Sequence, residues 1–355
     1  MAISTRSNHV GDVRGDFSAL PPLKRRCYEA LAHRESDVIP YTVYLYPEME
    51  AELDRYYGGR SQWPAFENHT CRILRPEWVK EEGGYAWDPY GCKFDTTGAA
   101  IKLVAYPLKE ASLKDYEMPD IMPDALMEEA NRTARENSER FVFYQFTGCY
   151  WGRTWRLRGV ENWLMDIYDH PDFVEEVLDR LAEVLIKGVQ RAALLPVDAI
   201  VVGDDYAMQR GLMISPDWWR RVIKPRLARI YDAVRQTGKM LGVHCCGDVG
   251  PILEDYADLG AQMLHPLQEE AVDIAWAKKT VGDRVAFRGG IGVQDVIPHG
   301  TPDEVRSYVK RCAKVLSANG GWLAETGKQL GTEVPVENAA AFLETLIQSC
   351  ERRDS

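Results

Sequence analysis

Two short segments carry residue types that could do chemistry together. Asp204 and Asp205 follow the apolar run AIVV, and His244 and Cys246 stand two residues apart after the apolar run MLGV. Side chains alternate along an extended strand, so His244 and Cys246 should point the same way. Imidazole, thiolate and carboxylate are all ligands of zinc. The spacing predicts a metal site or a direct catalytic role for His244, with an aspartate assisting. The alternative is a core histidine, with the aspartates capping a helix or pairing with arginine.

Polar residues also stand near the ends of other apolar runs. Tyr206 follows the aspartate pair, and Gln268 follows QMLHPL; we expect both to contact a substrate. Gly290, in FRGGI, would let a ligand approach the backbone closely, or would serve only a tight turn. Glu325 and Lys328, in the segment ETGK, add a carboxylate and an amine. These two either form an ion pair or take part in catalysis.

Three arginines form a further candidate group. Arg153, Arg156 and Arg158 alternate with aromatic and apolar residues after Gly148. Guanidinium groups suit planar recognition of carboxylates, so we expect Arg153 and Arg158 in particular to contact an anionic substrate. The alternative is a solvated basic face beside an aromatic core. Upstream, the segment DPYG at 88–91 predicts a turn.

The elements that must position these residues alternate between strand and helix. Apolar runs of strand length are separated by amphipathic stretches, as parallel strands with helical crossovers require. Thr301 and Ser215, each followed by proline, predict helix N-caps. We expect strands at 37–45, 141–148, 199–206, 239–247, 261–268, 285–292 and 320–327, and helices at 22–33, 159–170, 171–195, 215–236, 250–260, 273–282, 301–320 and 336–352.

This alternation suits an α/β fold, either a barrel or an open sheet. No G-x-G-x-x-G follows a strand, and polar residues recur at several strand ends, as in a ring that converges on one centre. We therefore predict a (β/α)8 TIM-type barrel, a single domain over 21–350 with an elaborated N-terminal region containing a hairpin. Residues 1–20 are expected to form a flexible arm.

Composition narrows the class of partner. The 355 residues carry a net charge of −11, which argues against nucleic acid or an anionic membrane surface as partner. The chain contains no apolar run of 18 residues, and its start lacks the apolar region of a secretory signal. The eight cysteines are scattered apart from one adjacent pair, so we expect reduced thiols and a cytoplasmic location.

An ordered series of motifs between about residues 23 and 347 resembles the uroporphyrinogen decarboxylase superfamily, which includes corrinoid and coenzyme M methyltransferases. The motifs are PLKRRCYEALAHRESDVIPY, LRGVENWLMDIYDHPDFVEEVLDRL, GDDYAMQRGLMISPDWWRRVIKPRLARIYDAVRQTGK, HCCGDVGPILEDYADLGAQMLHPLQ, FRGGIGVQDVIPHGTPDEV and VPVEN. The resemblance implies a distorted β/α barrel with one active-site cleft, often in a homodimer.

Within that superfamily the chain is more similar to the methyltransferase branch. True decarboxylases carry Arg-Gln-Ala-Gly-Arg after the first strand, where this chain reads YTVYLY without arginine. The methyltransferases hold zinc with His, Cys and a later Cys. His244 and Cys246 match the first two positions, and the third falls on Lys328, so Asp204, Asp205 or Glu325 would have to replace it.

The resemblance therefore implies a methyltransferase or demethylase that acts on a small methylated substrate at a zinc-type site. Its methyl acceptor would be a corrinoid on a separate protein. Two alternatives remain open. One is a metal-free decarboxylase or lyase, with an aspartate stabilising positive charge and arginines holding carboxylates. The other is a non-catalytic binding protein on the same barrel.

Overall fold

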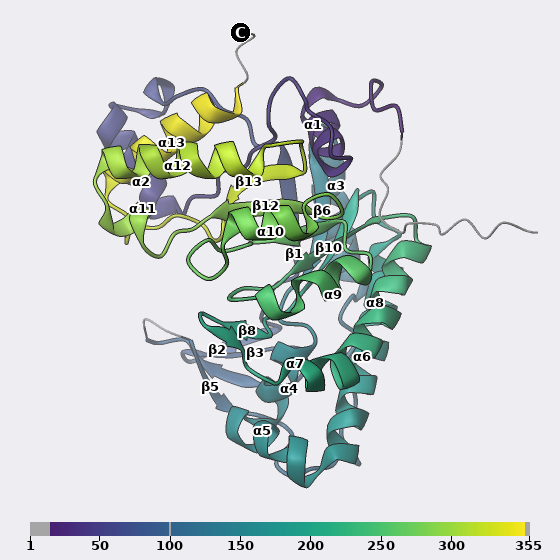
Figure 1. The fold of residues 1–355 in the computed structure, drawn as a ribbon. Helices are drawn as coiled ribbons and strands as arrows, with labels where there is room; N and C mark the ends of the chain where they lie inside the picture. The colour runs from purple at the N-terminus through teal and green to yellow at the C-terminus, as the bar shows by residue number, and fades with distance from the viewer. Residues whose placement is uncertain (1–14, 99–100, 352–355) are drawn as a thin grey trace, which may run out of the picture. The chain divides into compact units, whose positions relative to one another are not determined.

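The computed structural model describes residues 15–98 and 101–351 (Figure 1). Contacts divide these residues into two compact units. The first takes the described residues up to residue 70, together with 139–141 and everything from 252 onward; the second takes 71–138 and 142–251. Residues 1–14 of the predicted flexible arm lie outside the described residues. Within the described part of the chain, no helix is both long and apolar enough to cross a membrane.

The sheet strands of the second unit lie in the order β1, β6, β7 and β10. Their bounds are Thr70–Leu74, Phe141–Phe146, Ala199–Gly203 and Met240–His244. Strands β6, β7 and β10 are parallel neighbours, and every residue of β6 and β7 is buried. Burial on both faces explains why these strands read as continuous apolar runs.

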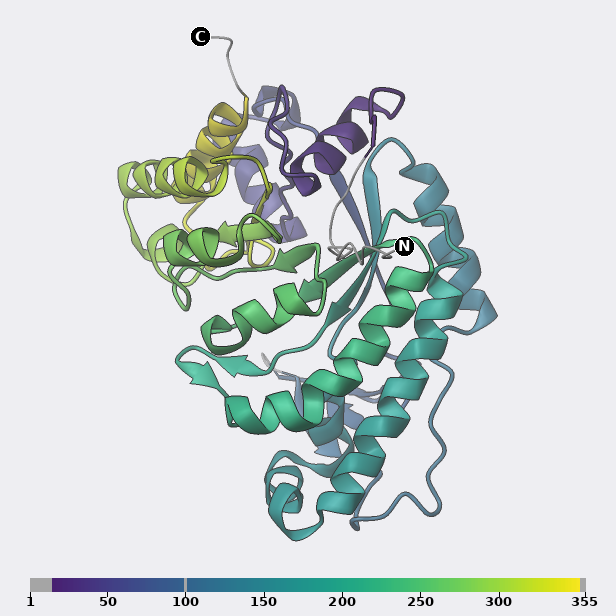
Figure 2. The ribbon, with the colours of Figure 1, turned by 45° about the vertical axis from the view of Figure 1, so that its right-hand side comes forward.

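Helices of the second unit separate these strands along the chain. Figure 2 shows α6 and α8 running side by side, and the two helices are in contact. Pro171 opens α6 at its first turn, where a missing N–H costs nothing. The helices are α3 (Asp124–Glu136), α4 (Trp151–Arg158), α5 (Val160–Asp169), α6 (Pro171–Ala192), α7 (Pro216–Trp218) and α8 (Lys224–Gln236).

The helix predicted at 215–236 is not continuous. A π-helical turn, Trp219–Ile223, lies between α7 and α8. Pro225, near the start of α8, has no N–H to donate to the preceding turn, so the regular hydrogen-bond ladder is interrupted there. Ser215 precedes α7 as predicted, but its side chain makes no capping hydrogen bond.

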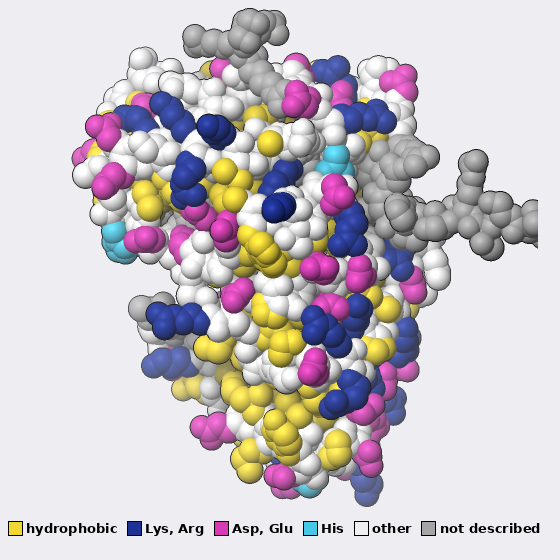
Figure 3. All heavy atoms as spheres, viewed as in Figure 1, with side chains coloured by type: hydrophobic (Ala, Val, Ile, Leu, Met, Phe, Trp, Pro, Cys, Tyr) yellow, Lys and Arg dark blue, Asp and Glu magenta, His cyan; other side chains and the backbone are white. Residues whose placement is uncertain are grey.

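The segment before α3 forms a four-stranded antiparallel sheet in the order β2, β3, β4, β5. The strands are Lys80–Glu82, Tyr85–Trp87, Lys93–Asp95 and Lys102–Ala105. A short hairpin, β8 (Ala207–Met208) and β9 (Gly211–Leu212), follows β7. Figure 3 shows hydrophobic side chains gathered where α5 lies, and the exposed residues of α5 include Leu164, Met165 and Tyr168.

The first unit contributes three parallel strands in the order β11, β12, β13, with bounds Met263–His265, Ala286–Ile291 and Trp322–Thr326. Thr301 caps α12 with the predicted capping box, in which Glu304 reaches back to Thr301. Helices α12 and α13 pack on each other. The helices are α1 (Pro22–Leu31), α2 (Pro47–Tyr57), α9 (Leu253–Asp258), α10 (Ile274–Val281), α11 (Val296–His299), α12 (Pro302–Leu316) and α13 (Val336–Cys350).

The strand predicted at 37–45 forms only isolated bridges. Tyr41 and Leu45 bridge Ala324 and Leu330 in the parallel sense, and the Ala324 N–H donates to the carbonyl of Pro40 at 2.8 Å. Pro40 has no N–H, so a regular ladder cannot form through it. The α/β class is confirmed. Within the described ranges, however, this first predicted strand is irregular, and the predicted eight-stranded barrel is not confirmed.

Candidate functional site

Asp205, His244 and Cys246 bring three metal-ligating atoms together in the second unit. These atoms all lie within 4.8 Å of one another. The His244 Nε2 atom is 3.7 Å from Asp205 Oδ1 and 3.5 Å from Cys246 Sγ. His244 and Cys246 are half-buried, whereas Asp205 is exposed, so the cluster opens to solvent. This group brings His244 and Cys246 together with Asp205, one of the two aspartates expected beside them.

The parallel register of two strands produces this cluster. His244, the last residue of β10, pairs with Gly203, the last residue of β7, so the residues that follow each strand end are neighbours. The Cys246 N–H donates to Asp205 Oδ1 at 2.8 Å and fixes that carboxylate. A Cβ on Gly203 would lie 2.7 Å from the carbonyl oxygen of Phe146, so only glycine fits between the neighbouring strands.

The Cys246 thiol needs a positive charge to ionise. Burial raises the pKa of Cys246 well above its usual range, and the negative charge of Asp205 raises it further. A bound divalent cation would act in the opposite direction, because it favours the thiolate and neutralises the carboxylate. Without such a cation, the thiol stays protonated.

Asp204 makes the contacts of a helix cap. It is buried, and its carboxylate accepts hydrogen bonds from the backbone N–H groups of Trp151 and Gly152, the latter at 2.7 Å. These are the first residues of α4, whose positive dipole end favours an anion. Burial raises the pKa of Asp204 to about 7, although the hydrogen bond from Gly152 lowers it. The two adjacent aspartates thus occupy different surroundings. The contacts of Asp204 match the alternative in which an aspartate caps a helix.

Tyr206 lies in an aromatic group beneath the cluster. It is buried, and its ring centroid is 5.9 Å from that of Trp219 and 6.3 Å from that of Trp151. Its backbone N–H donates to Cys245 Sγ at 3.4 Å. The ring of Tyr206 therefore packs among buried aromatic residues, directly after Asp205 in the chain. Its contact with substrate stays a prediction.

The three candidate arginines lie on α4, not on an extended segment, so their side chains diverge. Arg153 is buried and pairs with Asp88, in the turn predicted at 88–91. Arg156 pairs with Glu77 at 3.3 Å. Arg158 donates to Asp166 at 2.7 Å and to the carbonyl of Lys109 at 2.6 Å. A helix places Arg153 and Arg156 on one face, and Arg158 separates from them.

Arg153 and Arg156 line a cavity of about 300 Å³ near the ends of β1 and β6. A third arginine, Arg75, which was not among the predicted site residues, also lines it. Arg75 follows the short apolar end of β1 without a recognisable motif, so only the folded chain brings it to Arg153. The other lining residues are Leu74, Glu77, Tyr90, Ile121, Gln145, Phe146, Thr147 and Cys149.

In the first unit, strand ends meet in a buried charged cluster. Glu325 on β13 lies 3.4 Å from His265 Nε2 and 3.4 Å from Arg288 Nε, and all three side chains are buried. Lys328 pairs with Glu333 at 2.8 Å, and not with Glu325. The two predicted partners in the segment ETGK are therefore separated.

Gln268 and Gly290 also belong to the first unit. The Gln268 carbonyl accepts hydrogen bonds from Ala271 and Val272, at 3.0 and 2.8 Å, and begins a turn. Gly290 has a φ of 82°, and a Cβ there would lie 2.2 Å from a methyl carbon of Leu316. Packing against α12 is thus sufficient to require glycine at this position. The roles of both residues in substrate binding stay predictions, as does the expectation that residues of both units surround one cleft.

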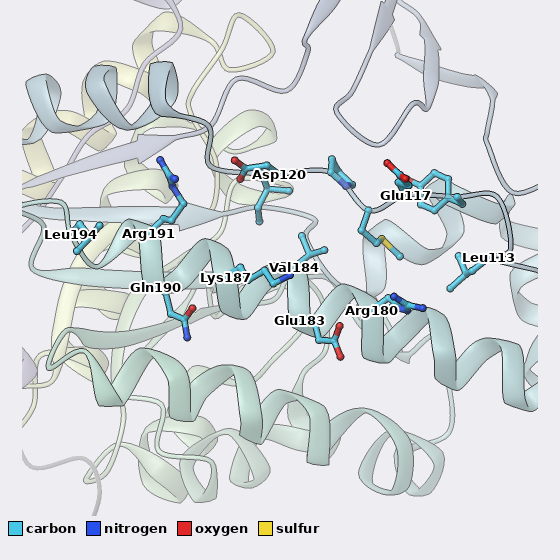
Figure 4. Close-up of a pocket in the computed structure, with 14 residues that line it drawn as sticks. Leu113, Glu117, Asp120, Arg180, Glu183, Val184, Lys187, Gln190, Arg191 and Leu194 are labelled. Carbon is cyan, nitrogen blue, oxygen red and sulfur yellow. The ribbon is translucent and has the colours of Figure 1, made fainter.

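A larger cavity, of about 900 Å³, contains none of the predicted site residues. Figure 4 shows that it lies between α6, which contributes Arg180, Glu183, Lys187 and Arg191, and the facing segment with Glu117 and Asp120. Its described lining includes neither histidine nor cysteine. The mixed charges suit a solvated groove. The Asp205 cluster and the arginine-lined cavity therefore remain the candidate functional sites.

Comparison with known proteins gives one family and several relatives. The family described as uroporphyrinogen decarboxylase (URO-D) matches residues 88–348. Over 172 residues, the chain is 28% identical to the methylcobamide:CoM methyltransferase MtaA of Methanosarcina barkeri, covering 48% of each protein. It is 25% identical over 227 residues to the uroporphyrinogen decarboxylase of Saccharophagus degradans, covering 61% of this chain and 62% of that protein.

The chain thus spans about half the length of the first of these relatives and less than two thirds of the second. A solved structure of a methyltransferase from Methanosarcina mazei matches with a TM-score of 0.68 at 20% identity, covering 92% of this chain and 98% of that one. At that identity the likeness shows the fold alone.

Proposed function

Because this chain belongs to the uroporphyrinogen decarboxylase family, we propose that it is a methyltransferase whose zinc-type site consists of Asp205, His244 and Cys246. Its substrate is a small methylated compound, and its methyl acceptor is a corrinoid carried by a separate protein. The observation that carries this proposal is the convergence of the three ligand atoms within 4.8 Å. Similarity to a methylcobamide:CoM methyltransferase supports methyl transfer that involves a corrinoid.

Two of the three separations between the ligand atoms match those of a tetrahedral zinc ion. A tetrahedral ion with bonds of about 2.0–2.3 Å separates its ligand atoms by roughly 3.3–3.8 Å. The separations from His244 Nε2 to Asp205 Oδ1 and to Cys246 Sγ, 3.7 and 3.5 Å, fall in that range. Three protein ligands leave a fourth position open, as catalytic zinc sites require. Asp205 would then replace the later cysteine of the methyltransferase pattern.

The residues of the chain have separable tasks in this proposal. When bound, zinc would act as a Lewis acid toward the heteroatom that carries the methyl group. His244 and Cys246 supply the nitrogen and sulfur ligands from one strand end. The backbone N–H of Cys246 holds Asp205 in place, and Asp204 anchors α4 to the same loop.

A metal-free decarboxylase or lyase is the second candidate. Similarity to uroporphyrinogen decarboxylases over as much as 72% of the chain favours it, as does the arginine-lined cavity. Against it stands the segment YTVYLY at 41–46, which lacks the arginines of the true decarboxylases. Metal content separates the two candidates.

The proposal is tested by elemental analysis of the purified protein beside three variants. We expect about one zinc per chain in the wild type, loss of that zinc in His244→Ala, and no change in His170→Ala, whose histidine is exposed at the end of α5. Loss of a direct ligand should weaken binding by more than the roughly 10–100-fold seen for outer-shell residues. A wild type without metal, together with zinc gained by Lys328→Cys, would move the decarboxylase to first place.

Activity supplies the second test. Free cob(I)alamin serves as acceptor for a panel of small methyl ethers, thioethers and methylamines. The methyl group passes to cobalt and the heteroatom is released with a proton. We expect the cob(I)alamin absorbance to fall with at least one compound in the wild type and not in His244→Ala. Methylation that persists in His244→Ala would contradict the proposal.

A further inference from the structure

The cavity lined by Arg75, Arg153 and Arg156 has an uneven balance of charge. Arg153 pairs with Asp88, and Arg156 pairs with Glu77. Arg75 has no ion pair among the described residues, and its Nη1 atom is buried without a hydrogen-bond partner in that part of the chain. Two of the three guanidinium groups are thus matched by carboxylates. The cavity therefore retains one unmatched positive charge.

Arg75 is half-buried, and leaving its buried Nη1 atom without a partner is costly. The pKa of Arg75 lies below its usual value, chiefly because burial disfavours the charged form, and the positive charge of Arg153 lowers it further. Arginine nevertheless stays protonated in proteins, so the charge persists. Such a group lowers the stability of the protein. An anion with two oxygens would remove that cost, because its oxygens would accept hydrogen bonds from the guanidinium N–H groups.

The cavity is shaped to hold such a group. Arg153 lies flat against Tyr90, with its guanidinium carbon 4.2 Å from the ring centroid, and the buried pair with Asp88 holds it there. Its Nε atom is buried and has no hydrogen-bond partner among the described residues. Gln145 adds a neutral donor and acceptor to the lining. A volume of about 300 Å³ is at the small end of the range for small-molecule sites.

The cavity lies on the same edge of the sheet as the Asp205 cluster. Cys149, which lines it, contacts the Gly203 carbonyl at 3.3 Å through its sulfur, and Gly203 pairs with His244. Strands β6 and β10 flank β7, so their ends are roughly 10 Å apart at the usual strand spacing. One small molecule could therefore reach both places.

From this geometry we infer that the cavity is an anion subsite that takes the carboxylate of a small, singly charged substrate. Arg75 supplies the unmatched charge, and Arg153 supplies a rigid donor beside it. Only the statement that this carboxylate belongs to the substrate rests on the proposed function. Binding of the carboxylate itself requires neither zinc nor the corrinoid partner.

The test is a ligand-observed NMR titration with propionate, its neutral isostere propionamide, and inorganic phosphate, all at constant ionic strength. We expect propionate to bind the wild type at least about tenfold more tightly than propionamide, because hydrogen bonds to charged groups are the strong ones. Arg75→Met should weaken propionate binding by about tenfold or more, whereas Arg132→Met, which removes an exposed charge from α3, should change it less than about twofold.

Three results would overturn the inference: equal binding of propionate and propionamide, equal loss in Arg75→Met and Arg132→Met, or phosphate binding more tightly than propionate. Arg75→Met also separates this inference from the proposed function. If His244→Ala loses zinc but keeps propionate, both hold. If the wild type holds no zinc but binds propionate through Arg75, only the proposed function fails.

Discussion

Each unit has one histidine and one carboxylate close together near the ends of its parallel strands, but the two clusters differ in their exposure to solvent. In the first unit, His265 and Glu325 are fully buried together with Arg288. In the second, His244 lies beside an exposed Asp205, and the third member is a thiol. The first cluster contains the guanidinium of Arg288 beside its carboxylate, whereas the second sets its carboxylate beside a histidine and a thiol. Placement at a strand end therefore does not itself predict chemistry; solvent access and residue type distinguish the closed cluster from the one proposed to bind a metal.

The largest expected effect is on the closed cluster. Glu325→Ala removes the carboxylate that faces both Arg288 and His265, so it should lower the free energy of unfolding by about 3–5 kcal/mol, as breaking a buried pair does. Lys328→Ala is the matched control, because its exposed pair with Glu333 should contribute less than about 1 kcal/mol. Urea unfolding measures both. Equal losses would show that the buried cluster is not what distinguishes the first unit.

The first unit should also lose stability in acid. Burial lowers the pKa of His69 to about 4, and the charge of Arg26 adds to this effect. The unfolded chain binds this proton near pH 6.5, so the stability is fully present above 6.5 and is lost as the pH falls toward 4. His69→Gln should remove that part of the pH dependence. The measurement is the free energy of unfolding of the wild type and of His69→Gln at several pH values between 7 and 4. The same dependence on pH in both proteins would contradict this role of His69.

Substitution in the exposed cluster of Asp205, His244 and Cys246 should change metal affinity and leave stability nearly unchanged. Asp205→Asn should weaken zinc binding by more than about 100-fold, because a direct ligand loses its charge. Since Asp205 is exposed, the free energy of unfolding of the metal-free protein should change by no more than about 0.5 kcal/mol. Competition with a coloured chelator measures the affinity. A variant that keeps its zinc but unfolds easily would reverse the roles given to the two clusters.

The smallest effect compares one helix start from each unit. Thr301→Ala should cost about 1 kcal/mol, because its hydroxyl accepts from the Glu304 N–H at 3.3 Å within a capping box. Ser215→Ala should cost close to nothing, because that hydroxyl makes no capping bond. Thermal unfolding distinguishes the two variants. A larger shift for Ser215→Ala would show that a cap forms in solution.

Periodicity predicted most elements of this fold. Apolar runs gave the strands, and amphipathic runs opened by proline, as at Pro171 and Pro302, gave the helices. Two failures have local causes: Pro40 prevents a regular ladder at 37–45, and Pro225 interrupts the helix after Ser215. The segment at 151–158, in which arginine alternates with aromatic and apolar residues, is the helix α4, so its three arginines point in different directions.

The candidate site was predictable where strand spacing determined it. His244 and Cys246 lie together as their two-residue separation suggested, although β10 ends at His244 and Cys246 lies just beyond it. The division of work between Asp204 and Asp205 was not predictable, because it depends on where α4 begins after the preceding strand. Arg75 was missed for a similar reason: its partners come from distant segments, and no local pattern marks a guanidinium that lacks a counter-charge.

X-ray absorption at the zinc edge of the purified enzyme tests the central claim most directly. A site built from Asp205, His244 and Cys246 predicts one sulfur neighbour at about 2.3 Å and nitrogen or oxygen neighbours at about 2.0–2.2 Å. In Cys246→Ser the sulfur shell should vanish while the lighter ligands remain. Two or more sulfur neighbours, or none, in the wild type would contradict this site.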